Sequence, residues 1–143
     1  MPNLPTTPIA MKTTGLHHIG LRTADVERAK RFYAEILGLP LMLETPTFLV
    51  FLAGTSLIGI IGPTEKTPKG DAFDPFRVGM DHAALACPSK VELQRVAEAL
   101  TAAGIKNTGL KTEKILDQQF EYVAFWDPDG IKWEFYMPGE PQR

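Results

Sequence analysis

The histidines of this chain are the residues best suited to chemistry, because a neutral imidazole is a common metal ligand. The chain has three of them, His17, His18 and His82. His18 and His82 each lie in a short apolar stretch with the alternation of a β-strand. Successive side chains of a strand point to opposite faces, so both histidines are expected to face away from the core. Small residues follow them on that face and leave room for a ligand.

A carboxylate near the end of the chain has a similar position. Glu134 lies between Trp133 and Phe135, and alternation places it on the face opposite these aromatic residues. A carboxylate in so apolar a segment is costly unless it is paired or bound to a metal. Two imidazoles and one carboxylate form a facial ligand set that leaves metal positions open for substrate or water. From this pattern alone, structural or surface roles for the three side chains remain open.

The elements that must position these residues occur twice in the same order. Each half predicts a strand, a helix and three further strands. In the first half these elements cover 16–22, 25–37, 39–44, 47–52 and 56–61. In the second half they cover 80–86, 89–104, 106–111, 120–126 and 131–136. Asp25 and Ser89 are the expected helix caps, and Gly38 and Gly104 the expected stops.

The two halves are expected to form one domain over 16–138. Module one covers 16–61 and module two covers 79–138, and a linker rich in Pro and Gly over 62–78 joins them. One βαβββ unit alone leaves an apolar sheet face exposed. We therefore expect an α+β fold in which two βαβββ modules form a curved eight-stranded mixed sheet with a concave metal or ligand pocket. Residues 1–15 and 139–143 are expected to be tails, the first of them flexible.

The composition excludes several kinds of partner. The net charge is −2 and no run of Lys or Arg occurs, so nucleic-acid and membrane-surface binding have no support. No apolar stretch approaches the roughly 20 residues of a membrane span, and residues 1–15 lack the pattern of a signal peptide. The lone Cys87 fits a reducing cytoplasm and is expected to be an inert core thiol. We expect a cytoplasmic protein whose partner is a small molecule.

Several motifs, taken in order, resemble the vicinal-oxygen-chelate superfamily of glyoxalases, bleomycin-resistance proteins and extradiol dioxygenases. They are the stretches 18–21, 32–33, 37–38, 79–82 and 127–130, followed by Glu134. The resemblance spans about 15–138. It implies that His18, His82 and Glu134 bind one divalent metal, either Fe, Mn, Zn or Ni, with His17 outside the ligand set. It also implies a homodimer, which fits the need to cover exposed sheet edges.

Departures from the family pattern narrow the chemistry. Gly59 stands at the position equivalent to Glu134, so a fourth protein ligand is not expected. The tyrosine that ring-cleaving dioxygenases carry before the final turn is Ala124 here, and no histidine follows His82. An acid–base group for catechol cleavage is therefore missing. Tyr122 is the candidate to orient a substrate or donate a proton, with core packing as its alternative role.

Two functions follow from these residues. The first is a metal-dependent enzyme of the glyoxalase and dioxygenase type, acting as a lyase, isomerase, dioxygenase or transferase on a small oxygen-chelating substrate. The alternative is a non-catalytic protein that binds a small molecule or drug, as bleomycin-resistance proteins do. The presence of His18, His82 and Glu134 favours the enzyme, because sequestration does not need a metal.

Overall fold

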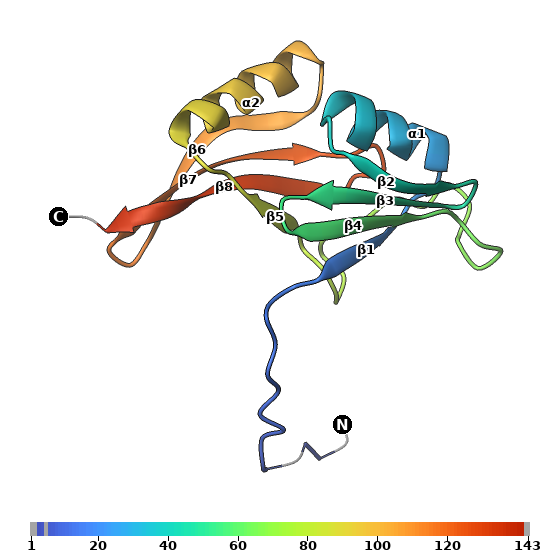
Figure 1. Ribbon diagram of the computed structural model, residues 1–143, viewed down its shortest axis with the longest axis horizontal. Helices are drawn as coiled ribbons and strands as arrows, with labels where there is room; N and C mark the ends of the chain where they lie inside the picture. The colour runs from blue at the N-terminus through green and yellow to red at the C-terminus, as the bar shows by residue number, and fades with distance from the viewer. Residues whose placement is uncertain (1–2, 5, 142–143) are drawn as a thin grey trace.

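The chain folds twice in the order β-α-β-β-β, as the sequence predicts (Figure 1). The computed structural model describes residues 3–4 and 6–141. Module one contains β1 (His18–Arg22), α1 (Val26–Lys30), η1 (Arg31–Ile36), β2 (Leu41–Thr45), β3 (Phe48–Ala53) and β4 (Ser56–Ile61). Module two contains β5 (Ala83–Ala86), α2 (Lys90–Ala102), β6 (Asn107–Ile115), β7 (Gln118–Trp126) and β8 (Lys132–Pro141).

The eight strands are divided into two four-stranded sheets, one for each module. The strand orders are β1-β4-β3-β2 and β5-β8-β7-β6. The first strand of each module pairs in parallel with the last, and the other pairs are antiparallel. The expected α+β fold with mixed strand pairing is therefore confirmed. β1, which contains His18, lies at the edge of one sheet, and β5, which directly follows His82, lies at the edge of the other.

The first helix begins at its expected cap and changes its winding halfway. Asp25 Oδ1 accepts a hydrogen bond from the backbone N–H of Arg28 at 3.0 Å. From Arg31 onward the helix is π-helical, and the N–H of Leu37 donates to the carbonyl of Phe32 at 2.9 Å. Gly38 has a positive φ of 70°, which glycine adopts without strain at a helix end.

The second helix follows its prediction closely. Ser89 accepts a hydrogen bond from the N–H of Glu92 at 3.1 Å, as a capping residue does. Leu93, Ala97 and Leu100 are buried on one side of α2, at the spacing that the apolar stripe predicts. Both helices lie on the same side of the sheets (Figure 1).

A single buried core extends across both modules, and a polar network crosses it. The Tyr33 hydroxyl donates to Asp127 Oδ2 at 2.6 Å and accepts from Trp133 Nε1 at 2.9 Å. Nearby, the Thr23 hydroxyl donates to Asp129 Oδ2 at 2.6 Å. Module one thus supplies hydroxyls to the Asp-Pro-Asp-Gly turn of module two. The turn that the sequence predicts between two strands also joins the modules.

Cys87 is buried, as expected. Its Sγ donates to the carbonyl of Ser89 at 3.1 Å, and desolvation raises the pKa of the thiol. A thiol with a raised pKa is a poor nucleophile at neutral pH. Cys87 therefore has the features of an unreactive packing residue.

The ends of the chain differ from expectation in one respect. β8 runs to Pro141, so the tail expected over 139–143 begins inside a strand, while residues 142–143 lie outside the described part. Residues 6–15 form neither helix nor strand and lie away from the body (Figure 1). No helix in the described ranges 3–4 and 6–141 is long and apolar enough to span a membrane.

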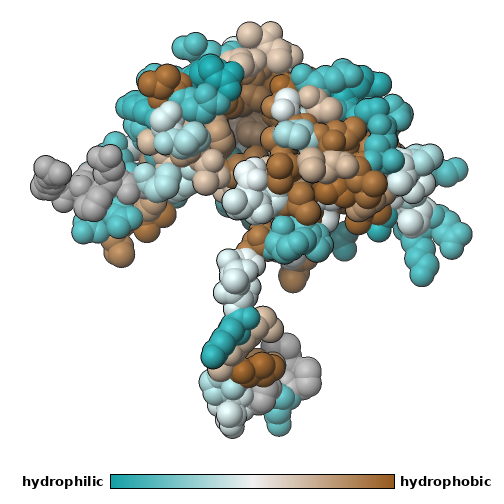
Figure 2. All heavy atoms as spheres, viewed as in Figure 1, coloured by the Kyte–Doolittle hydropathy of each residue, from teal (hydrophilic) through white to brown (hydrophobic). Residues whose placement is uncertain are grey.

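Apolar side chains also reach the surface. Figure 2 shows apolar residues gathered over the strands of module one on the viewed face, with hydrophilic residues around them. On β2, Met42 is 59% exposed and Leu43 50% exposed. Contiguous apolar surface of this kind commonly marks a protein–protein contact.

Candidate functional site

The candidate site in module two is built from the edge strand β5 and its neighbour β8. Ala84 pairs with Glu134 across these strands, and His82 precedes Ala84 by two residues. The alternating Ala83 and Leu85 pack against the core. Trp133 is buried in the core, so the next residue, Glu134, lies on the opposite face of the sheet, and His82 approaches it there.

Module one repeats this arrangement without its carboxylate. Gly20 pairs with Gly59 across β1 and β4, and His18 precedes Gly20 by two residues. Leu21 is buried, whereas His18 is exposed. Gly59 therefore takes the place that Glu134 takes in module two, as the sequence alignment of the halves predicts. His18 has no carboxylate at the equivalent position of its own module.

The imidazole of His82 lies between two carboxylates. Its Nε2 is 3.4 Å from Glu134 Oε2, and its Nδ1 is 2.7 Å from Asp81 Oδ1. The Glu134 side chain is only 10% exposed, and Lys132 Nζ lies 3.7 Å from its Oε1. Metal-binding histidines commonly bond a carboxylate through the nitrogen that does not face the ion. The donor set of His82 and Glu134, with Asp81 behind it, fits a divalent metal.

His18 lies apart from this pair on the edge of the other sheet. Its Nδ1 is 2.8 Å from Nδ1 of His17, so the contact with His17 does not involve its Nε2. Within residues 3–4 and 6–141, no three His, Cys, Asp or Glu side chains form a metal-binding group. One copy of the chain thus brings together His82 and Glu134 of the predicted ligands, and does not bring His18 into that pair.

A hollow of about 480 Å³ opens beside His82 and Glu134. This volume lies within the usual range of small-ligand pockets, about 300–1,000 Å³. Its lining consists of His82, Ala84, Glu113, Tyr122, Lys132, Glu134 and Tyr136. The predicted pocket residue Tyr122 is among them, so it faces the hollow.

An aromatic wall forms one side of this hollow. The rings of Tyr122 and Tyr136 are stacked, with centroids 5.4 Å apart and an interplanar angle of 16°. The Tyr136 hydroxyl donates to Glu113 Oε2 at 3.0 Å. Desolvation, together with Glu113, raises the pKa of Tyr136 to about 12. The phenol therefore keeps its proton at neutral pH and acts as a hydrogen-bond donor.

Sequence reasoning missed the contribution of Glu113. The strand expected over 106–111 ends before this residue, whereas β6 runs to Ile115. β6 and β7 continue as a long hairpin in which Glu113 pairs with Phe120. Alternation along a correctly extended strand places Glu113 on the same face as Lys111, so the strand's length was the missing signal.

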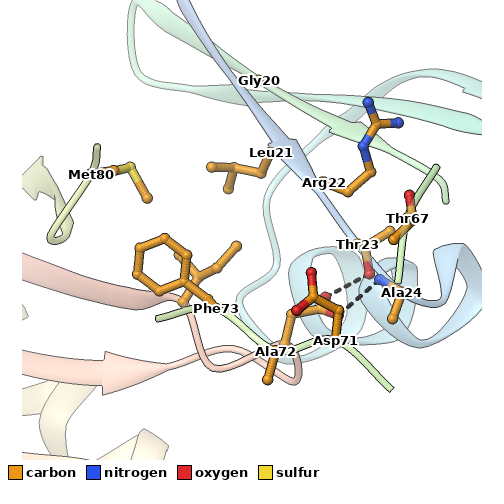
Figure 3. Close-up of a pocket in the computed structure, with 12 residues that line it drawn as sticks. Gly20, Leu21, Arg22, Thr23, Ala24, Thr67, Asp71, Ala72, Phe73 and Met80 are labelled. Carbon is orange, nitrogen blue, oxygen red and sulfur yellow. Dashed lines mark hydrogen bonds between the residues drawn. The ribbon is translucent and has the colours of Figure 1, made fainter. Parts of the chain in front are cut away.

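A second pocket of about 270 Å³ lies where the linker folds against β1. Figure 3 shows Leu21, Phe73 and Met80 at one end of this pocket and Arg22 and Thr67 toward the other. The backbone N–H of Phe73 donates to the carbonyl of Asp129 at 2.9 Å. This contact fixes the linker to the final turn of module two. The pocket contains none of the predicted metal ligands.

Comparison with known proteins agrees with the fold and the repeated modules. The sequence model of the Glyoxalase/Bleomycin resistance protein/Dioxygenase superfamily matches residues 15–135. The uncharacterized protein YwkD of Bacillus subtilis (strain 168) is 26% identical over 136 residues, covering 88% of this chain and 98% of that protein.

Solved structures give the same result. A glyoxylase/bleomycin resistance protein/dioxygenase domain from Frankia sp. EAN1pec has a TM-score of 0.73 at 26% identity, covering 89% of this chain and 99% of that one. Lactoylglutathione lyase from Agrobacterium tumefaciens has a TM-score of 0.66 at 20% identity, covering 89% of this chain and 96% of that one. At 20% identity the latter likeness concerns the fold alone. The chain therefore belongs to the Glyoxalase/Bleomycin resistance protein/Dioxygenase superfamily.

Proposed function

We propose that this protein is a divalent-metal-dependent enzyme whose small substrate chelates the metal through adjacent oxygens. The observation that carries the proposal is the approach of His82 Nε2 to Glu134 Oε2, at 3.4 Å. Two donors this close can both reach one ion, since such bonds are about 2.0–2.2 Å long. Nitrogen and oxygen donors suit Zn, Fe, Mn or Ni.

We further propose that His18 of a second copy completes the ligand set. β1 and β5 are sheet edges, and exposed edges are commonly covered by another chain. His18 is exposed, and the equivalent of Glu134 in its own module is Gly59. A homodimer in which each copy supplies His18 to the other would join the three ligands.

The residues around the proposed centre have separate tasks. A bound divalent ion supplies Lewis acidity, which polarises a carbonyl or stabilises an oxyanion. Asp81 orients the His82 ring through the 2.7 Å contact with Nδ1. Lys132 provides a positive charge next to Glu134 and is placed to attract an anionic substrate group. The stacked rings of Tyr122 and Tyr136 form one wall of the hollow.

The competing function is non-catalytic binding of a small molecule or drug. The aromatic wall favours it, because stacked rings bind flat ligands without any metal. The two functions differ in their dependence on the ion. Titration calorimetry with 2-oxo acids, 2-hydroxy acids and catechols compares the metal-loaded and metal-free protein. Binding that is lost without metal supports the enzyme, and equal affinity in both forms supports sequestration.

The proposed site is tested by mixing two variants. His18→Ala and Glu134→Gln should each weaken metal binding, because one removes a donor and the other the anionic ligand. A purified heterodimer of these variants should regain one complete site per dimer, since the intact His18 and the intact Glu134 then meet across one interface. Metal content measured by elemental analysis gives the readout. Glu98→Gln makes the same change as Glu134→Gln at an exposed carboxylate of α2; it is the matched control and should retain wild-type metal content.

The outcomes separate the parts of the proposal. Wild-type metal content in both single variants contradicts the ligand set. A heterodimer that binds no metal, when the wild type does, contradicts the sharing of ligands between copies. A dimer without metal in any form, including the wild type, contradicts the metal-dependent function itself.

A further inference from the structure

The open face of the second sheet is arranged in rows around Glu134. Ala84 pairs with Glu134 on one side and Ala124 pairs with it on the other. Ala84 lines the hollow and carries only a methyl group, so no bulky side chain separates the hollow from the carboxylate on that side. A ligand can therefore approach Glu134 and His82 closely from the direction of the hollow.

The next row toward the hairpin is aromatic. Tyr136 pairs with Tyr122, and their rings are stacked at 5.4 Å. The Phe120 ring lies 5.5 Å from the Tyr136 ring at an angle of 39°. Three aromatic rings thus form a continuous wall. Two of them, Tyr122 and Tyr136, line the hollow directly.

A hydrogen bond across two strands holds this wall. Tyr136 on β8 donates to Glu113 on β6, at 3.0 Å, over the intervening β7. The bond restrains rotation of the Tyr136 ring, and the stacking then restrains Tyr122. Glu113 itself is exposed at the hairpin, so a carboxylate there has no need of this partner for its own solvation. The contact therefore orients the tyrosine.

The spacing along β8 sets the separation between the metal donors and the wall. Tyr136 follows Glu134 by two residues, which corresponds to about 7 Å along a strand. Lys132 precedes Glu134 by the same interval and lies on the same face, toward the other end of the strand. A ligand whose oxygens chelate a metal at His82 and Glu134 would have its chelating end there. A ring attached one or two bonds from that end would then lie against the tyrosines. A carboxylate of that ligand would lie toward the ammonium of Lys132.

We infer that the pocket selects aryl-substituted 2-oxo or 2-hydroxy acids, with Tyr122 and Tyr136 as specificity-determining residues and Glu113 as the residue that positions Tyr136. This inference rests on the proposed metal site and names the ligand class of that site. A catechol carries its oxygens on the ring itself, so its ring would remain near the metal donors. The wall is separated from those donors by a strand interval that suits the longer aryl acid.

The test compares phenylpyruvate with pyruvate, which differ only in the ring. Calorimetry uses the Zn²⁺-loaded protein, because zinc has no redox chemistry with these acids. Phenylpyruvate should bind about tenfold more tightly than pyruvate, the size expected of an added aromatic contact. Tyr136→Leu should abolish this preference, so that the two acids bind with equal affinity.

Variants of Glu113 test its positioning role. Glu113→Ala should lower the ratio of phenylpyruvate affinity to pyruvate affinity, because the loss of its charge acts on both anions whereas only the ring of phenylpyruvate contacts the wall. Glu113→Gln keeps an oxygen acceptor for the Tyr136 hydroxyl and should restore the preference. Glu98→Ala, on the exposed surface of α2, is the matched control and should bind both acids as the wild type does. If Glu113→Ala lowers the affinity for both acids by the same factor, the variant has only lost stability in general. That result would contradict the positioning role.

Two results would overturn the inference, and they are distinct from failure of the metal site. If the zinc-loaded wild type binds pyruvate and phenylpyruvate equally, the wall does not select ligands, although the metal site stands. If catechol binds more tightly than phenylpyruvate and Tyr136→Leu does not change this order, the ligand class is wrong. Absence of bound zinc in the wild type would instead overturn the proposed function on which the inference depends.

Discussion

At the scale of single residues, the Tyr33 hydroxyl makes a buried contact between the two modules. It links Asp127 of the final turn to the indole of Trp133, and all three side chains are buried. Buried polar groups of this kind are costly to leave without partners. The hydroxyl therefore satisfies a donor and an acceptor that water does not reach.

Tyr33→Phe should lower the free energy of unfolding by about 2–4 kcal/mol, because it leaves both Asp127 Oδ2 and Trp133 Nε1 unpaired. Urea denaturation followed by tryptophan fluorescence measures the change. Tyr122→Phe removes a hydroxyl from the half-buried wall and should cost much less. A loss below that of the control variant would show that the network contributes little.

The same residue predicts a pH dependence at the alkaline end. The pKa of Tyr33 is raised above the ordinary value of 10.0, first by burial and then by the charge of Asp127. The unfolded chain releases this proton from about pH 10, whereas the folded chain keeps it. The stabilisation is complete below pH 10.0 and is lost as the pH rises above it. Unfolding measured between neutral and strongly alkaline pH should show a shallower decline in Tyr33→Phe, and equal slopes would contradict this origin.

Asp81 gives a prediction for the metal centre. Removing the carboxylate that bonds Nδ1 of His82 should reduce metal affinity about 10–100-fold, the usual effect of losing such a partner. Competition with a chelator measures the affinity of Asp81→Ala against the wild type. Asp71→Ala removes an exposed carboxylate in the second pocket and should bind metal normally. Equal metal affinities in the two variants would show that Asp81 does not orient the His82 ring.

At the scale of the elements, two glycines in and just after β4 should differ in how well they tolerate a side chain. A Cβ at Gly62, just after β4, would lie 2.8 Å from Cγ2 of Val26 and 3.2 Å from the carbonyl oxygen of Thr47. A Cβ at Gly59, inside β4, would meet only ordinary contacts, the nearest at 3.5 Å from Phe48. The chain is thus crowded where β4 leaves the sheet and open where the missing ligand would stand.

Gly62→Ala should therefore destabilise the protein by about 1–3 kcal/mol, the usual cost of overpacking. Gly59→Ala should have a small effect and serves as the control within the same segment. Thermal unfolding of the two variants and the wild type gives the comparison. Equal melting temperatures for the two variants would mean that α1 shifts freely to accommodate the methyl group.

The elements also show what the sequence predicts and where it stops. Alternation is a local property, so it correctly placed Trp133 in the core and Glu134 on the opposite face of the sheet, beside His82. Helix caps at Asp25 and Ser89 are equally local. The π-helical turn and the extension of β6 past Glu113 depend on tertiary packing and cross-strand pairing. Local patterns do not contain that information.

At the scale of the whole molecule, the same limit applies to His18. The sequence places three ligands on equivalent faces, but the distance between two sheets is a property of assembly. The division of the strands into two sheets separates the ligand of module one from the pair in module two. The ligand set therefore remains a prediction whose completion requires a second copy.

The protein is predicted to be a homodimer whose stability depends on the metal. An ion that bridges two chains favours association, so metal removal should raise the concentration at which the dimer dissociates. Sedimentation at micromolar concentration, with and without a chelator, measures this. In His18→Ala the dissociation should no longer respond to the chelator. A wild-type monomer at micromolar concentration with metal present would contradict the arrangement.

Gly59 has a consequence for the charge of the proposed centre. One half has the imidazole and the carboxylate, and the other has the imidazole alone. In the proposed centre, a divalent ion is then balanced by one carboxylate and keeps a net positive charge. This asymmetry between the two halves would make the centre an attractor for anions, whereas a centre with a second carboxylate in place of Gly59 would be electrically neutral.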